Sequence, residues 1–362
     1  MKDKITNYEI IREYKNIQEN HNINSLSSQE SKENFHQFIN GFYQAEGTMG
    51  AYFARENSLA IRFIFSIGQN YSPEALNVFL NLQKVLGLGK IRLEFNSNNQ
   101  PHIRYIVTNT KDLIFKVLPY FSLLYGQKRK DRIILLKIYE LSLEIMASLK
   151  EEVKLNNTLT CEYIHLIYSI NPDGKKRKLS LSDKLQLFNC GSITYKGNLE
   201  TIENDSLPSK LFIIGLFLGD GNFGFVFDAP PIRSPKFYIK LVFNFAAQSN
   251  TNSNIELLKL VAKKMNIKPQ IYIRKSGMIG LQYTGETVFK YIMPFLAEYQ
   301  DWLFWRENQF INAQNIIAIF KNNGHLNKEG LKQIVNLLYD MPNKYLKPKE
   351  FWMYLVDKRL WK

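Results

Sequence analysis

An internal repeat is the feature of this sequence that most constrains its fold. Residues 39–47 read INGFYQAEG and residues 213–221 read IIGLFLGDG, so both segments carry Gly six positions before a final Gly and an acidic residue directly before it. Strand-like stretches ending in Gln69 and Gln248 follow the two segments, and a Pro-aromatic pair lies at matching places further along. A repeat of this length predicts two copies of one domain in a single chain.

The repeat also sets the expected domain boundaries. The first copy should span residues 35–174, and the second should span residues 210–362 and include C-terminal helices. Residues 1–34 are polar and should form an N-terminal extension. The polar, glycine-containing stretch 175–209 should link the two copies.

Each copy shows the same order of predicted elements: helix, hairpin, helix, hairpin, helix, helix. Apolar and charged side chains alternate in residues 90–95, as a half-buried strand requires, so Ile91 should face the core. In the second copy, Ile271 and Ile273 should face inward and Arg274 outward. We therefore expect an α+β fold of two pseudo-symmetric αββαββα repeats, each with an antiparallel sheet whose one face is covered by helices and whose polar, basic face is open.

Small residues recur four positions apart in both repeated segments. They are Gly41 and Ala45 in the first copy and Gly215 and Gly219 in the second. Such a stripe on a helix lets another helix backbone approach closely. We therefore expect the two motif helices to pack together at the domain interface, about a pseudo-two-fold axis, with their C-terminal ends side by side.

The acidic residues Glu46 and Asp220 would then lie at helix C-termini. Such an end carries partial negative charge, so an adjacent carboxylate costs about 0.3–1 kcal/mol. The following Gly47 and Gly221 can adopt the left-handed conformation common after helices. A divalent cation would relieve the repulsion, and hard oxygen ligands suit Mg²⁺. One such acid would be an ordinary solvated turn residue, whereas two in register within a duplicated domain indicate a metal site.

The charge balance restricts the possible partners. Lys and Arg number 47 against 33 Asp and Glu, which gives a net charge of +14 and favours a polyanion such as nucleic acid. No apolar run reaches the ~18 residues that a membrane span needs, so we expect no membrane partner. Phosphate-binding Walker loops, nucleophile elbows and dinucleotide fingerprints do not occur in the sequence.

The composition also bears on the origin of the chain. Lys, Asn and Ile are abundant and have A/T-rich codons, as expected for many organellar genes. The N-terminal sequence contains Glu9 and Glu13 and resembles neither a signal peptide nor a transit peptide. We therefore expect a protein of the mitochondrion, or of another organelle such as the chloroplast, that is made inside the organelle.

The segments 39–47 and 213–221 resemble the two motifs of a monomeric LAGLIDADG homing endonuclease. The order of the other elements over about residues 35–345 is also similar to that family. The first copy departs from the pattern at Asn40 and Gln44, which are polar, and at Glu46, which replaces Asp. The resemblance implies that the two sheets form a saddle on double-stranded DNA and that a monomer cuts both strands of a long asymmetric target, which promotes homing of the intron that encodes it.

The resemblance also assigns roles to residues. Glu46 and Asp220 would bind the divalent metal ions, assisted by the carbonyls of Ala45 and Gly219. Gln69, Gln248 and Lys128 complete the implied catalytic set, since the two Gln would organise the solvent network and Lys128 would stabilise charge on the phosphate. The second copy has no clear Lys at the matching position, where Lys275 or Arg306 could substitute.

Strand parity gives a set of expected DNA contacts. The outward-facing polar residues are Arg62, Ser66, Arg92, Arg104, Lys240, Asn244, Arg274 and Gln282. In the major groove, Arg and Lys pair best with guanine, and Asn and Gln pair best with adenine. His102 shares the parity of Arg104 and should face the same surface.

Two other functions are consistent with the same motifs. One is an RNA-binding maturase that assists splicing of intron RNA, with or without nuclease activity. The other is a DNA-binding module that has lost catalysis. The retained acids favour the endonuclease over the inactive module, but they do not separate the endonuclease from the maturase.

Overall fold

The structure is a computed structural model of the 362-residue chain. It describes residues 7–20, 28–151, 156–170, 179–190, 206–228, 238–341 and 347–358. The chain divides into two compact units, Met1–Ser206 and Leu207–Lys362. Each unit is described by itself below.

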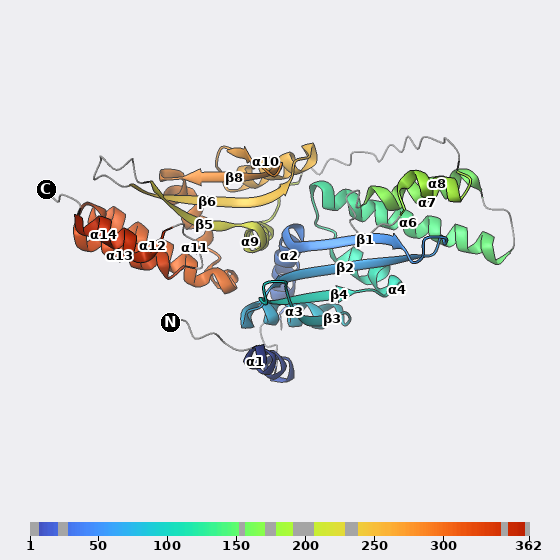
Figure 1. The fold of residues 1–362 in the computed structure, drawn as a ribbon, viewed down its shortest axis with the longest axis horizontal. Coiled ribbons are helices and arrows are strands. Elements are labelled where there is room, and N and C mark those ends of the chain that lie inside the picture. The colour runs from blue at the N-terminus through green and yellow to red at the C-terminus, as the bar shows by residue number, and fades with distance from the viewer. Residues whose placement is uncertain are drawn as a thin grey trace. The chain divides into compact units, whose positions relative to one another are not determined.

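The first unit contains one antiparallel sheet and a set of helices (Figure 1). Its helices are α1 (Asn7–Asn20), α2 (Gln29–Glu46), α3 (Pro73–Leu86), α4 (Thr110–Asp112), the π-helix η1 (Leu113–Val117), α5 (Leu118–Tyr120), α6 (Gly126–Lys150), α7 (Asn157–Ser169) and α8 (Leu181–Leu187). Its strands are β1 (Gly47–Phe53), β2 (Ile61–Asn70), β3 (Lys90–Phe95) and β4 (Pro101–Val107), in the sheet order β1-β2-β4-β3.

The second unit repeats this plan. Its helices are α9 (Lys210–Asp220), α10 (Asn252–Lys264), η2 (Val288–Ile292), α11 (Met293–Ala297), η3 (Gln300–Trp302), η4 (Phe304–Arg306), α12 (Glu307–Lys321), η5 (Gly324–Leu326), α13 (Lys328–Tyr339) and α14 (Lys349–Lys358). Its strands are β5 (Asn222–Asp228), β6 (Tyr238–Ser249), β7 (Ile271–Ile273) and β8 (Met278–Thr284), in the order β5-β6-β8-β7. The predicted α+β fold of two αββαββα repeats is confirmed.

One face of each sheet forms the core of its unit. In the first unit, the rings of Tyr43 on α2 and Phe65 on β2 stack at 4.5 Å. In the second, Phe217 on α9 stacks on Phe243 of β6 at 5.3 Å. Burying such large aromatic side chains stabilises the packing of each motif helix on its sheet.

Two details of the second sheet differ from the first. Strand β6 carries a register irregularity between Phe245 and Gln248, so that Gln248 pairs with Ile279 as Gln69 pairs with Ile103. Ile273 pairs with the buried Ile279 and so has the inward parity that we predicted, but its side chain is still 65% exposed at the end of the short edge strand β7. A three-residue strand at a sheet edge has too few neighbours to bury its last side chain.

The regions outside the two repeats also form structure. In the N-terminal extension, the Tyr14 hydroxyl on α1 donates to the Ile91 carbonyl at 3.0 Å. The expected linker 175–209 contains α8, which packs against α7 of the first unit (Figure 1). Among the described residues, no helix combines the length and apolar character that crossing a membrane requires.

Candidate functional site

Helix α2 ends at Glu46 and passes directly into β1. Gly47 follows with φ −75° and ψ 151°, and its N–H donates to the Tyr43 carbonyl. The left-handed conformation that we expected there is therefore wrong, and it is wrong for Gly221 as well, which has φ −79° and ψ 157°. Glycine is needed instead for space, because a Cβ at either position would collide with the ring of Tyr43 or Phe217.

The carboxylates of the two motifs hold equivalent places in their own units. Glu46 is the last residue of α2 and Asp220 is the last residue of α9, and both are half-buried. In the second unit, Gln248 Nε2 donates to Asp220 Oδ2 at 3.0 Å. In the first unit, Gln69 Oε1 accepts from the backbone N–H of Asn70 at 2.7 Å, so the two Gln side chains are used differently.

Lys128 lies at the C-terminal end of the first motif helix. From the first turn of α6, its Nζ donates to the Tyr43 carbonyl at 3.0 Å and to the Gly47 carbonyl. A cation is favourable at this end of a helix, because the last carbonyls are unsatisfied and the dipole is negative there. The structure therefore brings Lys128 and Glu46 to the same helix terminus.

A half-buried carboxyl group, that of Asp131, accompanies Lys128. Asp131 Oδ1 accepts from Gln127 Nε2 at 2.9 Å. Burial raises the pKa of Asp131 to about 6, although Gln127 and Lys128 act in the opposite direction. Burial, and secondarily Asp131, also raises the pKa of Tyr43 well above its ordinary value. Our reading of the sequence missed Asp131, which its spacing of three residues from Lys128 on a helix could have indicated.

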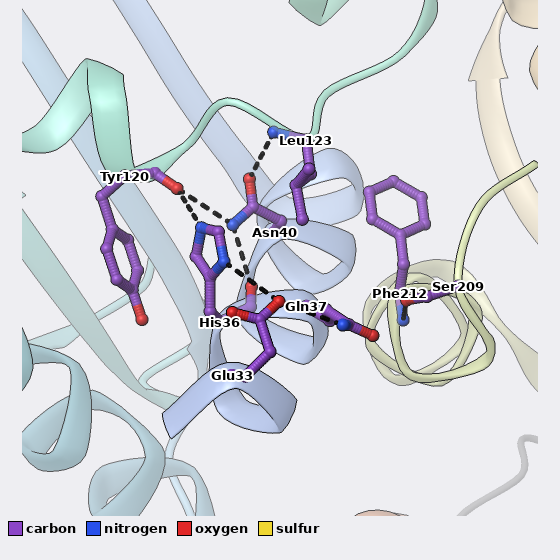
Figure 2. A network of polar contacts seen from close by, with 8 residues as sticks. All are labelled: Glu33, His36, Gln37, Asn40, Tyr120, Leu123, Ser209 and Phe212. Atoms are coloured by element: carbon purple, nitrogen blue, oxygen red, sulfur yellow. Dashed lines mark hydrogen bonds and ion pairs between the residues drawn. The ribbon is translucent and has the colours of Figure 1, made fainter. Parts of the chain in front are cut away.

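The polar residues Asn40 and Gln44 of the first motif tie α2 to the segment that precedes α6. Asn40 Nδ2 donates to the Tyr120 carbonyl at 3.2 Å, and its Oδ1 accepts from the Leu123 N–H at 3.1 Å (Figure 2). Gln44 Oε1 accepts from the Tyr125 N–H at 3.0 Å. Both side chains are fully buried. The two side chains provide hydrogen-bond partners for backbone groups at the end of α5 and between α5 and α6. They thereby hold the segment that leads to Lys128 in place.

Arg306 takes the place of Lys128 in the second unit. Its Nε donates to the Leu218 carbonyl at 3.2 Å and its Nη2 to the Gly219 carbonyl at 3.3 Å, just before Asp220. Its Nη1 also reaches Gln309 Oε1 at 3.4 Å. Of the two residues that we considered as substitutes for a Lys, Arg306 is therefore at the helix end, while Lys275 lies exposed in the turn after β7.

The open face of the first sheet carries the predicted cationic residues. Arg62 and Arg92 are exposed and Ser66 is half-buried, whereas their strand neighbours Phe63 and Ile91 are buried. Arg104 is half-exposed and lies 3.6 Å from Glu94.

His102 lies close over Gly68 of this face, where a Cβ would collide with its ring. Burial, and secondarily the charge of Arg104, lowers the pKa of His102. Arg104 lies directly across from the exposed Arg92 in the β3–β4 pair, so positive charge gathers on this part of the face.

The open face of the second sheet is more amide-rich. Gln282 Nε2 donates to Asn244 Oδ1 at 3.0 Å, across the pair β6–β8. Arg274 is exposed, and its Nη2 donates to the Tyr272 hydroxyl at 2.9 Å. The side chain of Lys240 lies outside the described residues, although its backbone pairs with Val226. The described residues thus offer donors and acceptors along both open faces.

Comparison with known proteins agrees with this arrangement. Residues 39–139 match the model of the family described as LAGLIDADG endonuclease. This segment is therefore similar to a LAGLIDADG endonuclease domain. The match covers the first motif, its sheet and the start of α6, including both Glu46 and Lys128.

Solved structures extend the LAGLIDADG fold over most of the chain. I-SmaMI, bound to an uncleaved DNA target in the presence of calcium ions, has a TM-score of 0.67 and 20% identity, over 85% of this chain and 99% of its own. The LAGLIDADG homing endonuclease I-LtrWI, bound to target DNA, has a TM-score of 0.66 and 21% identity, over 86% of this chain and 98% of its own. Among curated protein sequences, none matches.

The two LAGLIDADG helix ends provide ligands that fit a hard divalent cation. Each offers one carboxylate and main-chain oxygens, and Mg²⁺ accepts such a small set because it keeps water and phosphate ligands. Among the described residues, no group of three His, Cys, Asp or Glu side chains could hold a metal ion. Arg306 already binds the Gly219 carbonyl, so it competes with a metal ion for that oxygen.

Proposed function

We propose that this protein is a site-specific homing endonuclease that hydrolyses both strands of a long, asymmetric double-stranded DNA target. One observation carries the proposal: each motif helix ends in a carboxylate, and a cationic side chain binds the carbonyls of the same helix end. Glu46 and Lys128 form this pair in the first unit, and Asp220 and Arg306 form it in the second. The DNA complexes of I-SmaMI and I-LtrWI support the choice of substrate.

The chain's own residues divide the work of the proposed reaction. The open sheet faces hold the DNA in register, through the predicted contacts to base edges and phosphates. Lys128 and Arg306 place positive charge beside the scissile phosphate and stabilise the charge that develops there. Gln248 orients the Asp220 carboxylate through its 3.0 Å hydrogen bond.

Glu46 and Asp220 are the residues that would hold the Mg²⁺ ions. When bound, divalent ions supply an activated water and stabilise the leaving oxygen. The proposal requires that a single chain brings both carboxylates to the same DNA target.

We propose further that the protein is encoded by an intron in a mitochondrion or another organelle and acts there. The A/T-rich codon usage that the composition implies supports this origin. Sequencing the gene in its genomic context tests it, because a nuclear gene with no surrounding intron contradicts the proposal.

A cleavage assay tests the function. The purified protein is incubated with Mg²⁺ and a plasmid that carries the intronless junction of its own gene. Linear product that requires both the junction and the metal supports the proposal, and a plasmid with the intron inserted is the matched control. Tight binding of the intron RNA together with an intact junction plasmid would instead support the maturase.

A site-selection experiment tests the open faces. Losing one good bidentate base contact should cost about 1–3 kcal/mol and relax the preference at one position. Arg104→Ala and Arg274→Ala should each relax a different position of the selected site. A selected site that is unchanged by the double variant would exclude these two residues as base contacts.

A further inference from the structure

Helix α8 is a firmly built part of the first unit, although it lies in the stretch that we expected to be a linker. Ser180 and Asp183 form a reciprocal cap at its N-terminus. The Tyr168 hydroxyl on α7 donates to the Leu179 carbonyl at 2.9 Å, and Cys161 Sγ on α7 donates to the Cys190 carbonyl at 3.4 Å. Helix α7 therefore holds α8 at both ends.

Lys184 projects from the middle of α8 into the first unit. Its side chain is 1% exposed, and its Nζ donates to the Ser58 carbonyl at 2.9 Å and to the Glu56 carbonyl. The Nζ also lies 3.9 Å from the ring centroid of Phe53 and 4.8 Å from that of Phe188. Burial lowers the pKa of Lys184 to about 8, against the opposing charge of Glu56.

The two carbonyls that Lys184 binds belong to the turn of the β1–β2 hairpin. The same turn is held by a second contact, in which the Tyr163 hydroxyl on α7 donates to the Leu59 carbonyl at 3.2 Å. Leu59 is buried, whereas Arg55 and Asn57 point to solvent on the same turn. In Figure 1, α7 and α8 lie beside the ends of β1 and β2 that this turn connects.

A buried lysine is an expensive way to fill this space. Desolvation of an ammonium group is offset here by two carbonyl acceptors and two aromatic rings. An aliphatic side chain of similar length would fill the same volume without that cost, but it would leave the Glu56 and Ser58 carbonyls without this donor. The arrangement therefore fixes the turn's backbone, which packing alone would not do.

We infer that Lys184 is a positioning residue for target recognition, which holds the β1–β2 turn so that Arg55 and Asn57 contact DNA at the outer part of the first half-site. The inference rests on the proposed function. Strand β1 runs seven residues from Gly47 to Phe53, so the turn lies about 20 Å along the sheet from Glu46. At about 3.4 Å per base pair, this distance corresponds to roughly six base pairs.

The test compares Lys184→Met with Lys111→Met, a control at an exposed lysine of the same unit. Site selection from a randomised target pool should show that Lys184→Met lowers base preference at least threefold about six base pairs outward from the cut. Preference near the cut should stay unchanged. A purely structural role would weaken all positions equally.

Two further measurements cover a variant that folds poorly. Arg55→Ala with Asn57→Ala leaves Lys184 in place and should reduce preference at the same outer positions. Hydrogen exchange without DNA should be faster at the amides of residues 54–60 in Lys184→Met, and Lys184→Arg should restore slow exchange in part. Unchanged preference in the double variant, or unchanged exchange in Lys184→Met, would overturn the inference. A wild-type protein that selects no site contradicts the proposed function itself, while the exchange result still decides whether Lys184 holds the turn.

Discussion

A cationic side chain binds the C-terminal carbonyls of each motif helix, but the residue type differs between the two units. In the first unit, the Lys128 amine binds carbonyls on both sides of Glu46, and the half-buried Asp131 lies on the same helix as Lys128. In the second unit, the Arg306 guanidinium spans the Leu218 and Gly219 carbonyls before Asp220. What the duplicated domains share is a cation at each helix end, and the identity of the residue that provides it has changed.

The buried amide side chains near each cationic residue also differ between the two units. Asn40 and Gln44 bind the segment before α6 with buried amides, whereas the matching positions of α9 are the apolar Ile214 and Leu218. Gln309 holds the second site instead, since its Nε2 donates to Asn222 Oδ1 at 3.2 Å and to the Phe223 carbonyl at 3.1 Å. Each unit has therefore placed its buried amides on a different element.

The largest effect should come from the acids. Glu46→Gln or Asp220→Asn should reduce cleavage of at least one strand by about 10³-fold or more, because a bound metal contributes several kcal/mol to such a reaction. DNA binding should change by less than about tenfold, which a filter-binding assay in Ca²⁺ measures. Cleavage at the wild-type rate by both variants would exclude these residues as metal ligands.

The next effect separates the two cations. Lys128→Met and Arg306→Met should each slow cleavage about 10²–10³-fold, as expected for one preorganised charge-stabilising donor. If each cation serves its own catalytic centre, both variants should accumulate nicked plasmid, but the uncut strand should differ between them. Primer extension identifies which strand is nicked. Arg306→Lys is the informative control. Equal slowing of both strands by either variant would mean that the two cations do not act at separate centres.

A smaller effect concerns stability in the first unit. Asn40→Leu or Gln44→Leu copies the apolar character of the second motif but removes the side-chain acceptor of the Leu123 N–H or of the buried Tyr125 N–H. Each change should lower the free energy of unfolding by about 1–3 kcal/mol in urea. Gln37→Leu serves as the control on the same helix, since its side chain bonds to Glu33 at the surface. Full stability of both variants would show that these amides do not hold the segment.

The smallest effect is pH-dependent. Because the folded state raises the pKa of Asp131 from 3.8 to about 6, its ionisation costs stability above pH 6, and the cost disappears below about pH 4. Asp131→Asn should therefore stabilise the protein by about 1–2 kcal/mol at pH 7 and by nothing at pH 4. Thermal unfolding at both pH values measures this, with the exposed Asp301→Asn as control. A gain that is equal at both pH values would refute a titrating Asp131.

The sequence was most informative where a periodic pattern or a repeat recorded the structure. Strand alternation predicted that Arg62 and Arg92 would face outward while Ile91 would be buried, because a half-buried strand has only two faces. The repeat predicted the order of elements in both units. The resemblance to the LAGLIDADG family assigned Lys128 to the first centre, although only the structure shows which carbonyls it binds.

Contacts between distant segments could not be predicted in this way. The roles of Asn40 and Gln44 depend on carbonyl and N–H groups about 80 residues further along, which no local pattern records. Arg306 was only one of two alternatives, because the irregular η3 and η4 turns before it obscure the spacing. The sequence predicted a linker where α8 lies because this stretch is polar. The residue that packs α8 into the first unit is Lys184, and lysine is rarely buried.

The irregularity in β6 has a consequence for how a strand tolerates a change in length. One extra residue in a strand ordinarily turns every following side chain to the opposite face. Here the extra residue is confined between Phe245 and Gln248, so the strand beyond it returns to its original alternation and Gln248 still reaches Asp220. The extra residue therefore does not change the contact of Gln248 with Asp220 at the end of α9. It bends β6 locally, and this bend can change the direction of the open face of the sheet. Deleting Ala246 would remove the extra residue and, with it, the local bend in β6.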